Sequence, residues 1–310
     1  MKKKLVIISG PTGVGKTNLS IALAKLIGGE IISADSMQVY KYMDIGSAKV
    51  TVEEMDGVTH HLIDVLSPMD SFDVNRFQSM AYKAMDEIYE RGHIPIIVGG
   101  TGFYIQSVLY NIDFQNEPTD QTYRKELEQL YTEKGGKYLH EMLQKVDAKA
   151  AEEIHENNVK RVIRALEYYK QTGEKISDHN QKQKEKISPY DFTYFVLTDD
   201  RQKLYQRIDE RVDEMVEQGL VDEVKKLKSM GCDSSMVSMQ GIGYKEILDY
   251  LEEKYSLERA IYLIKQGSRH YAKRQLTWFR REKDVTWINK EDFSYDNHKI
   301  LEYMKQKIFQ

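Results

Sequence analysis

The stretch Gly10-Pro11-Thr12-Gly13-Val14-Gly15-Lys16-Thr17 has the spacing G-x-x-x-x-G-K-[ST] of a phosphate-binding loop. The apolar run Leu5-Val6-Ile7-Ile8, typical of a buried strand, precedes it directly. Leucines at helical spacing follow between Thr17 and Gly28 and predict a helix. A strand that delivers a glycine-rich turn to a helix N-terminus lets backbone N–H groups and the helix dipole converge on one phosphate group. The eight residues therefore predict a phosphate site at the edge of an α/β sheet.

Two side chains of this loop add chemistry of their own. We expect Lys16 to neutralise the outer phosphate and the Thr17 hydroxyl to help hold a Mg²⁺ ion. The alternative, a glycine turn that arises by chance, fits poorly with a strand and a helix on either side. The loop does not indicate which molecule carries the phosphate.

With 310 residues and 41% hydrophobic content, the chain is long enough for one large domain or two smaller ones. No apolar run approaches the ~20 residues that span a bilayer, and Met1-Lys2-Lys3-Lys4 leads into a strand and not into a signal peptide. We therefore expect a cytoplasmic protein that has no membrane partner. Nothing in the sequence indicates the oligomeric state, for which a monomer is our starting expectation. The single cysteine, Cys232, excludes internal disulfides and a multi-cysteine zinc site.

The net charge and the local basic clusters give opposite indications about nucleic-acid binding. The net charge of −4 does not favour it. Basic clusters nevertheless occur at Lys160-Arg161 with Arg164, at residues 182–186 and at residues 269–281. Such a cluster is usually a solvated face, so the clusters alone leave the question open.

Strands and helices alternate over the first hundred residues. We expect strands at 4–9, 30–34 and 94–98, and helices at 16–27, 73–91 and 102–110. This order is the doubly wound α/β pattern.

The character of the sequence changes between about Asn111 and Pro189, where it becomes charged and helical without an apolar run of strand type. A strand returns at 192–197, a helix at 200–218 capped by Asp199-Asp200, a long amphipathic helix at 257–281 and a final strand at 285–288. The predicted fold is thus a P-loop NTPase-like parallel sheet core, residues 1–112 and 190–310 with C-terminal helices, and an inserted all-helical domain, residues 113–189.

Asp35 follows the second strand, and ligands of open α/β sheets bind beyond the carboxyl ends of the strands. We therefore expect Asp35 beside the phosphate loop, as a general base or a metal organiser. A turn or cap aspartate is the alternative.

Glycines and a threonine follow the strand at 94–98, in Gly99-Gly100-Thr101-Gly102-Phe103-Tyr104. P-loop ATPases place a Walker B aspartate after such a strand, so its absence weakens the ATPase interpretation. Glycines here would let the backbone approach a ligand, and Thr101 could bond a phosphate oxygen. A plain strand-to-helix turn is the alternative.

On the helix at 200–218, Arg211 lies at the edge of the predicted buried stripe and Arg207 farther out. A guanidinium suits diphosphate oxygens, so Arg211 could fold over a bound phosphate, although an exposed helix charge fits equally well. His60-His61 with Asp64 suggests a metal site only weakly, and structural or substrate-contact roles are preferred.

Within the insert, one helix is expected to face Val162, Ile163 and Leu166 inward and to project Arg161, Arg164 and Tyr168 outward. Basic groups aligned with an aromatic ring could follow a nucleic-acid backbone. The segment from Arg269 to Arg281 offers a second such surface.

The ordered set of motifs resembles the bacterial tRNA dimethylallyltransferases, the isopentenyl-tRNA transferase family. The motifs are 10–17, 34–40, Gly46-Ser47-Ala48-Lys49, His60-His61-Leu62-Ile63-Asp64, 99–104, 160–167, Gly241-Ile242-Gly243-Tyr244-Lys245-Glu246 and Tyr271-Ala272-Lys273-Arg274-Gln275. The resemblance runs to about Arg281. Ser47 departs from the family's usual threonine, which is a conservative change.

The resemblance implies transfer of a dimethylallyl group from dimethylallyl diphosphate to N6 of the adenosine directly 3′ of the anticodon in tRNA, with release of diphosphate. It also implies that the loop binds an isoprenoid diphosphate, with Mg²⁺ shared between Thr17 and the phosphates, which accounts for the missing Walker B residue.

Roles for individual residues follow from the same resemblance. Asp35 would accept the N6 proton, Thr101 would contact the donor phosphates or the substrate, and Arg211 would clamp the diphosphate. Residues 36–38 and 240–245 would surround the extruded adenosine, and Arg124 with residues 160–164 would bind the anticodon stem-loop. The full set implied in tRNA binding is Asp35, Ser36, Met37, Gln38, Thr101, Arg124, Lys160, Arg161, Val162, Ile163, Arg164, Gln240, Gly241, Ile242, Gly243, Tyr244 and Lys245.

Three other functions are weighed against this one. An adenylate isopentenyltransferase shares the core but modifies free nucleotides, and a mononucleotide needs no basic-faced insert of about seventy residues. A P-loop nucleotide or metabolite kinase is supported by the loop alone. A non-enzymatic RNA-binding protein would show no turnover.

Overall fold

The computed structural model describes residues 2–114 and 121–310. By its internal contacts the chain divides into two compact units, Met1–Leu109 with Ser188–Gln310, and Tyr110–Ile187. The first unit contains the sheet and the second consists of helices. Residues 115–120, which belong to the predicted insert, lie outside the described part.

The sheet of the first unit has six parallel strands in the order β3-β2-β4-β1-β5-β6. The strands are β1 Lys4–Ser9, β2 Gly29–Ser33, β3 His60–His61, β4 Ile94–Gly99, β5 Asp191–Thr198 and β6 Val285–Asn289. The apolar runs predicted as strands therefore form the sheet, and the α/β fold with a parallel sheet is confirmed.

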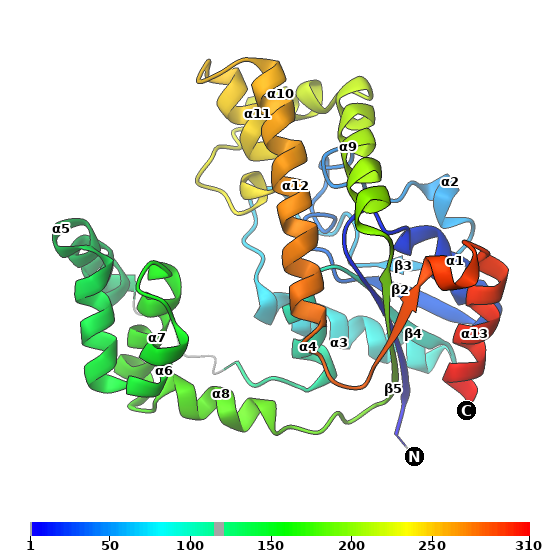
Figure 1. Ribbon diagram of the computed structural model, residues 1–310, viewed down its shortest axis with the longest axis horizontal. Helices are drawn as coiled ribbons and strands as arrows, with labels where there is room; N and C mark the ends of the chain where they lie inside the picture. The colour runs from blue at the N-terminus through cyan, green and yellow to red at the C-terminus, as the bar shows by residue number, and fades with distance from the viewer. Residues whose placement is uncertain (1, 115–120) are drawn as a thin grey trace. The chain divides into compact units, whose positions relative to one another are not determined.

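The helices of this unit cover both faces of the sheet, with α1 and α13 on one side and α3 and α4 on the other (Figure 1). They are α1 Lys16–Ile27, α2 Val52–Met55, α3 Val74–Glu90, α4 Gly102–Leu109, α9 Arg201–Glu217, α10 Leu220–Ser229, α11 Tyr244–Leu251, α12 Leu257–Phe279 and α13 Asn297–Phe309, with short 3₁₀ helices η1 Ser238–Gln240 and η2 Lys290–Phe293. The long helices α9 and α12 extend from the sheet toward α10 and α11 (Figure 1).

The helical unit comprises α5 Gln121–Val146, α6 Ala148–Glu153, α7 Val159–Thr172 and α8 Ile176–Lys184. Non-helical backbone at Gly135 divides α5 into two helices. Leu127, Leu139 and Leu143 of α5 pack with Val162 and Leu166 of α7 in a core of the unit's own.

The start of α9 differs from the prediction. Asp200 is the N-cap, because its carboxylate accepts the backbone N–H groups of Gln202 and Lys203. Asp199 does not cap the helix. Its carboxylate is buried and bonds the Arg207 guanidinium at 2.5 Å and the Tyr295 hydroxyl at 2.9 Å.

Candidate active site

The phosphate loop connects β1 to α1 at the carboxyl end of the sheet. Gly13 and Gly15 have φ values of 77° and 88°, in the left-handed region that a side chain disfavours. Gly15 is also the N-cap of α1. Alternating backbone of this kind turns successive N–H groups toward one concavity, so the loop has the conformation of an anion-binding nest.

Lys16 lies across this loop. Its Nζ donates to the carbonyl oxygens of Gly10 and Pro11, each at 2.9 Å. Burial, together with the nearby Arg211 guanidinium, lowers the pKa of Lys16 to about 8, although Asp35 opposes the shift. Arg211 and Asp35 thus both lie close enough to Lys16 to act on its charge, and the structure places the two side chains around Lys16.

Asp35 sits at the end of β2, as the strand order predicts. Its Oδ1 accepts the backbone N–H of Met37 at 2.8 Å and that of Gln38 at 3.4 Å. These are the bonds of a turn aspartate, so that alternative is part of its role. The same carboxylate also acts electrostatically on Lys16.

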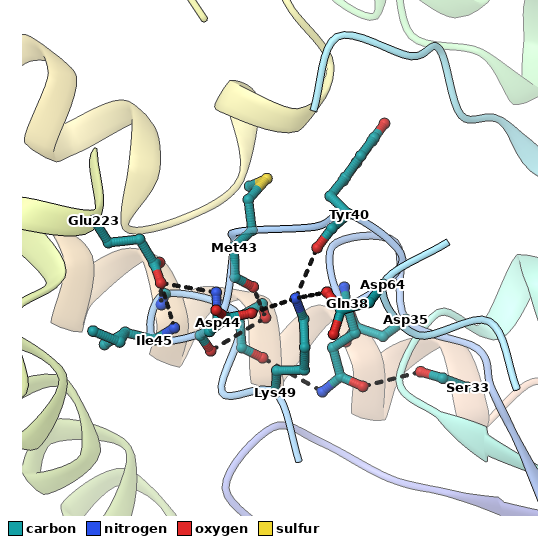
Figure 2. A network of polar contacts seen from close by, with 12 residues as sticks. Ser33, Asp35, Gln38, Tyr40, Met43, Asp44, Ile45, Lys49, Asp64 and Glu223 are labelled. Atoms are coloured by element: carbon teal, nitrogen blue, oxygen red, sulfur yellow. Dashed lines mark hydrogen bonds and ion pairs between the residues drawn. The ribbon is translucent and has the colours of Figure 1, made fainter. Parts of the chain in front are cut away.

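Gln38 is held inside the loop that follows Asp35 (Figure 2). Its Oε1 accepts the Ser33 hydroxyl at 3.0 Å, and its Nε2 donates to the carbonyls of Ser47 and Ala48 at 3.4 and 3.3 Å. The amide of Gln38 therefore shapes the loop, and its polar atoms already have protein partners. A Cβ on Gly241 would lie 2.7 Å from Met37 Sδ, so Met37 packs against the segment 240–245.

Glu223 of α10 ties this region together (Figure 2). Its carboxylate accepts the backbone N–H groups of Asp44, Ile45 and Gly46 at 2.8 to 3.0 Å, and the Tyr244 hydroxyl at 2.8 Å. Burial raises the pKa of Tyr244, whose ring is fully covered. Tyr244 thus supports the loop from within, and contact between its side chain and RNA does not fit this structure.

Lys49 fixes the other side of the same loop (Figure 2). Its ammonium donates to the Tyr40 carbonyl at 2.7 Å and pairs with Asp44 and Asp64, each at 2.6 Å. Its side chain is only 5% exposed, so the loop is anchored by a cation that it encloses.

The glycines after β4 pack against protein. A Cβ on Gly100 would lie 2.0 Å from Gln275 Nε2, and one on Gly102 would lie 2.2 Å from the Trp278 ring. The expectation that these glycines admit a ligand is therefore wrong for these two positions, because helix α12 occupies the space.

Thr101 lies between these glycines with its Oγ1 buried. Within the described residues, Oγ1 meets no partner at good hydrogen-bond geometry. Tyr271 is a neighbour, and burial raises its pKa to about 12, with Asp35 adding to the shift and Thr101 opposing it. A buried hydroxyl without a partner at good geometry is the feature expected of a ligand contact.

Arg211 lies where the helical period predicted, whereas Arg207 does not. Arg211 is half-buried near Lys16, and burial lowers its pKa. Arg207 was expected farther out, yet its Nε donates to the Gly13 carbonyl at 3.1 Å while it pairs with buried Asp199. A helical period fixes which face a residue occupies, but not that the phosphate loop lies over that face.

The sequence did not predict Lys290 as a residue of this site. It begins η2 directly after β6, and its Nζ donates to the Val14 carbonyl at 3.4 Å. Its lone position in the sequence gives no motif. The only available signal was the predicted last strand, whose carboxyl end must lie at the same edge as the loop.

In the helical unit, Lys160, Arg161 and Arg164 are exposed on α7. Val162 and Ile163 are buried in the unit's core, so the structure corrects the expectation that their side chains contact tRNA: they can only position the basic residues between them. Tyr168 is also buried and does not project beside the arginines; the exposed aromatic of this helix is Tyr169, 37% exposed.

Arg124 forms a bidentate pair with Glu167, with bonds of 2.8 and 2.7 Å. The Glu167 side chain is fully buried, whereas that of Arg124 is 43% exposed. Removing the arginine would leave a buried carboxylate uncompensated, so Arg124 has a structural task whether or not it meets RNA.

The two histidines of the sequence motif have protein partners. His60 Nδ1 bonds the Val58 carbonyl at 2.8 Å, and His61 Nε2 bonds Glu30 at 2.7 Å. Glu30 also accepts two bonds from Arg91, which hold the pKa of the carboxyl at about 2. The role of His61 visible here is structural.

The residues around the loop fit a magnesium ion bound jointly with a diphosphate. Thr17, the second residue of α1, is exposed, with Asp35 near the adjacent Lys16. In the described ranges no three His, Cys, Asp or Glu side chains gather as a metal site. Mg²⁺ suits such a site, because it commonly binds through one or two protein oxygens, water and substrate phosphates.

These groups can bind a diphosphate, balance its charge and remove a proton nearby. A parallel sheet with this loop after β1 and a carboxylate after β2 defines a P-loop α/β protein that acts on a phosphorylated ligand. No described helix is long and apolar enough to cross a membrane.

Comparison with known proteins specifies the class further. A family model described as IPP transferase matches residues 38–282, and the chain belongs to this family. It is 58% identical to a tRNA dimethylallyltransferase of Lachnoclostridium phytofermentans over 301 residues, which cover 97% of this chain and 96% of that protein. The expectation of an enzyme of this family is confirmed.

Solved structures of similar proteins support the same family. A tRNA isopentenylpyrophosphate transferase of Bacillus halodurans is 49% identical with a TM-score of 0.74, over 99% of this chain and 97% of that one. The corresponding enzyme of Staphylococcus epidermidis is 45% identical with a TM-score of 0.73, over 99% of both chains. A eukaryotic dimethylallyltransferase studied while acting on tRNA is 34% identical with a TM-score of 0.79, over 94% of this chain and 75% of that one.

Proposed function

We propose that this enzyme transfers the dimethylallyl group of dimethylallyl diphosphate to N6 of the adenosine directly 3′ of the tRNA anticodon, position 37, and releases diphosphate. The observation that carries the proposal is a phosphate loop with Lys16 bonded across it and with Asp35 and Arg211 close enough to act on the charge of Lys16. Support for the substrates comes from the relatives, whose names specify this transfer and tRNA.

In the proposed reaction, the bond between C1 of the dimethylallyl group and the diphosphate oxygen breaks, and the electron pair leaves with diphosphate. A bond forms between C1 and N6, and N6 loses a proton. The loop residues Gly10 to Thr17 hold the departing diphosphate, while Lys16 and Arg211 balance the charge that grows on it.

Asp35 accepts the proton from N6 in this proposal. An exocyclic amine is a weak nucleophile, so positioning and proton removal contribute much of the acceleration. The turn bonds to Met37 and Gln38 fix the direction of the carboxylate. Thr101, whose buried Oγ1 lies near Tyr271, bonds the donor phosphates or the adenosine.

Magnesium is the proposed cofactor, and Thr17 would help to hold it together with the bound diphosphate. When bound, it neutralises charge on the leaving diphosphate. The chain's own cations act on the same oxygens, and Lys16 orients the loop through its bonds to Gly10 and Pro11.

The proposed partner is the tRNA anticodon stem-loop. Ser36, Met37 and Gln38, with residues 240–245, form the surroundings of the extruded adenosine, with Gln38 and Tyr244 acting through the loop that they support. Lys160, Arg161 and Arg164 are exposed and suited to phosphates. Arg124 contributes by the exposed part of its guanidinium. The monomeric state and cytoplasmic location stay predictions.

Incubation with Mg²⁺, dimethylallyl diphosphate and either unmodified tRNA or AMP, ADP and ATP tests this function. We expect nucleoside mass spectrometry to find the dimethylallyl mass on adenosine from tRNA alone. Gain on the free nucleotides would favour an adenylate isopentenyltransferase. Transfer of the ATP γ-phosphate, without any dimethylallyl gain, would indicate a kinase.

A further inference from the structure

Three side chains from the C-terminal half of the sheet unit bond three consecutive residues of the phosphate loop. Gln275 Oε1 accepts the Thr12 N–H at 2.9 Å. Arg207 Nε donates to the Gly13 carbonyl at 3.1 Å, and Lys290 Nζ to the Val14 carbonyl at 3.4 Å. These side chains come from α12, α9 and η2, which the strand order β1-β5-β6 brings to the edge that carries the loop.

Peptide geometry makes two of these bonds informative. In a trans peptide the C=O and N–H groups point in opposite directions. Lys290 holds the carbonyl of the Val14–Gly15 peptide, so the Gly15 N–H is turned away from Lys290. Arg207 holds the preceding peptide in the same way, and the Val14 N–H closes a turn on the Pro11 carbonyl at 3.4 Å. Orientation of these peptides decides whether the loop N–H groups converge on an anion.

Lys290 and Arg207 are also neighbours. Lys290 is half-buried, and its Nζ lies 3.2 Å from where a Cβ on Gly15 would be. Burial, and then the neighbouring Arg207, lower the pKa of Lys290, while Asp199 opposes the shift. The two cations therefore lie close together beside the loop, and the buried Asp199 carboxylate pairs with one of them.

We infer that Arg207, Lys290 and Gln275 are positioning residues that hold the phosphate loop in its diphosphate-binding conformation. The inference rests on the function proposed above, since the diphosphate is that of the donor. Gln275 completes the set because its Nε2 donates to the Gly100 carbonyl at 3.0 Å and so joins the loop to the turn that carries Thr101.

Lys290→Met tests the inference in the full chain, because methionine fills the space without charge or donor. By isothermal titration with inorganic diphosphate and Mg²⁺, we expect affinity to fall by about tenfold, the typical effect of a hydrogen bond to a charged group. The kcat/KM for dimethylallyl diphosphate falls by a similar factor, and the KM for tRNA does not change. Lys290→Arg retains most of the affinity. Lys299→Met, at an exposed lysine of α13, is the matched control and binds like the unchanged protein.

Diphosphate affinity that stays within about twofold of the unchanged protein in both Lys290→Met and Arg207→Lys would overturn the inference. Arg207→Lys is the second variant in case Lys290→Met fails to fold, which thermal unfolding would reveal. If the protein bound diphosphate in a way that depends on Lys290 but did not prenylate tRNA, the proposed function would be refuted. The positioning role of Lys290 would still be supported. Absence of diphosphate binding to the unchanged protein would refute both.

Discussion

Asp35 performs two tasks that one substitution can separate. Asparagine keeps an oxygen able to accept the N–H groups of Met37 and Gln38, but it cannot accept a proton at neutral pH. We therefore expect Asp35→Asn to lower kcat by about 10²- to 10⁴-fold, the usual contribution of a general base, with tRNA affinity unchanged. Single-turnover kinetics and a tRNA binding assay check this.

Asp35→Ala is the companion variant, because it removes the turn bonds as well. We expect it to lose the same turnover and to leave tRNA binding largely intact. If Asp35→Asn retained activity, or if both variants lost tRNA binding in proportion to turnover, Asp35 would be a structural residue and the base would lie elsewhere.

Lys16 should make donor capture depend on pH. Its pKa is about 8, so the side chain carries its charge below that value and loses it as the pH rises through it. The kcat/KM for dimethylallyl diphosphate reports the free enzyme, and we expect it to fall above pH about 8.

Lys16→Arg provides the control for this profile, since a guanidinium keeps its charge throughout the range. The variant should be slower, because its geometry differs, but it should lack the decline. The same alkaline decline in Lys16→Arg would assign the titration to another group.

At the scale of elements, the hydrophobic pattern predicted most of the sheet unit. Each predicted strand lies within two residues of a strand of the structure, including β6 at Val285–Asn289, because buried parallel strands are apolar on both faces. The sequence predicted only a mostly helical C-terminal part and did not distinguish the separate helices α10, α11 and α13. Their boundaries depend on caps such as Asp296, which ordinary surface aspartates resemble.

Contacts between side chains on different elements could not be predicted from the sequence. Nothing near Asp199 indicates that it bonds Arg207, because the choice between a cap and an ion pair is decided by burial after folding. The burial of Tyr168 shows the same limit, since it lies at the border of the apolar face of α7. The loop motif itself was predictable because its local backbone performs the chemistry.

Glu223 supplies a prediction for one element, the loop 44–46. Both carboxylate oxygens accept N–H or O–H groups, so Glu223→Gln would place an amide donor against donors. We expect the amides of Asp44, Ile45 and Gly46 to exchange hydrogen at least about tenfold faster, consistent with loss of one or more charge-assisted bonds. Hydrogen–deuterium exchange with mass spectrometry measures this.

Asp222→Asn is the matched control, since Asp222 precedes Glu223 on α10 and is exposed. Its exchange pattern at residues 44–46 should equal that of the unchanged protein. Unaltered exchange in Glu223→Gln would show that the other contacts of the loop, such as those of Lys49 and Gln38, hold it without Glu223.

For the whole molecule, the net charge of −4 poses a problem for a protein proposed to bind tRNA, because long-range attraction is absent. Local phosphate contacts must then supply the affinity. Lys160, Arg161 and Arg164 are exposed on one helix of the helical unit, whose buried Val162 and Ile163 fix their direction. Each phosphate contact adds about 0.7 to 0.9 to the slope of log affinity against log salt concentration.

The double variant Arg161→Ala with Arg164→Ala should therefore weaken tRNA binding and reduce that slope by about 1.5, as expected for two lost phosphate contacts. The matched control changes Lys299 and Lys305, two exposed lysines of α13, to alanine and keeps both affinity and slope. Binding of tRNA measured between low and moderate salt separates the two cases. Because both pairs change the net charge equally, a slope that fell by the same amount in the control would mean that overall charge governs binding, and an unchanged slope in the arginine variant would move the tRNA contact away from α7.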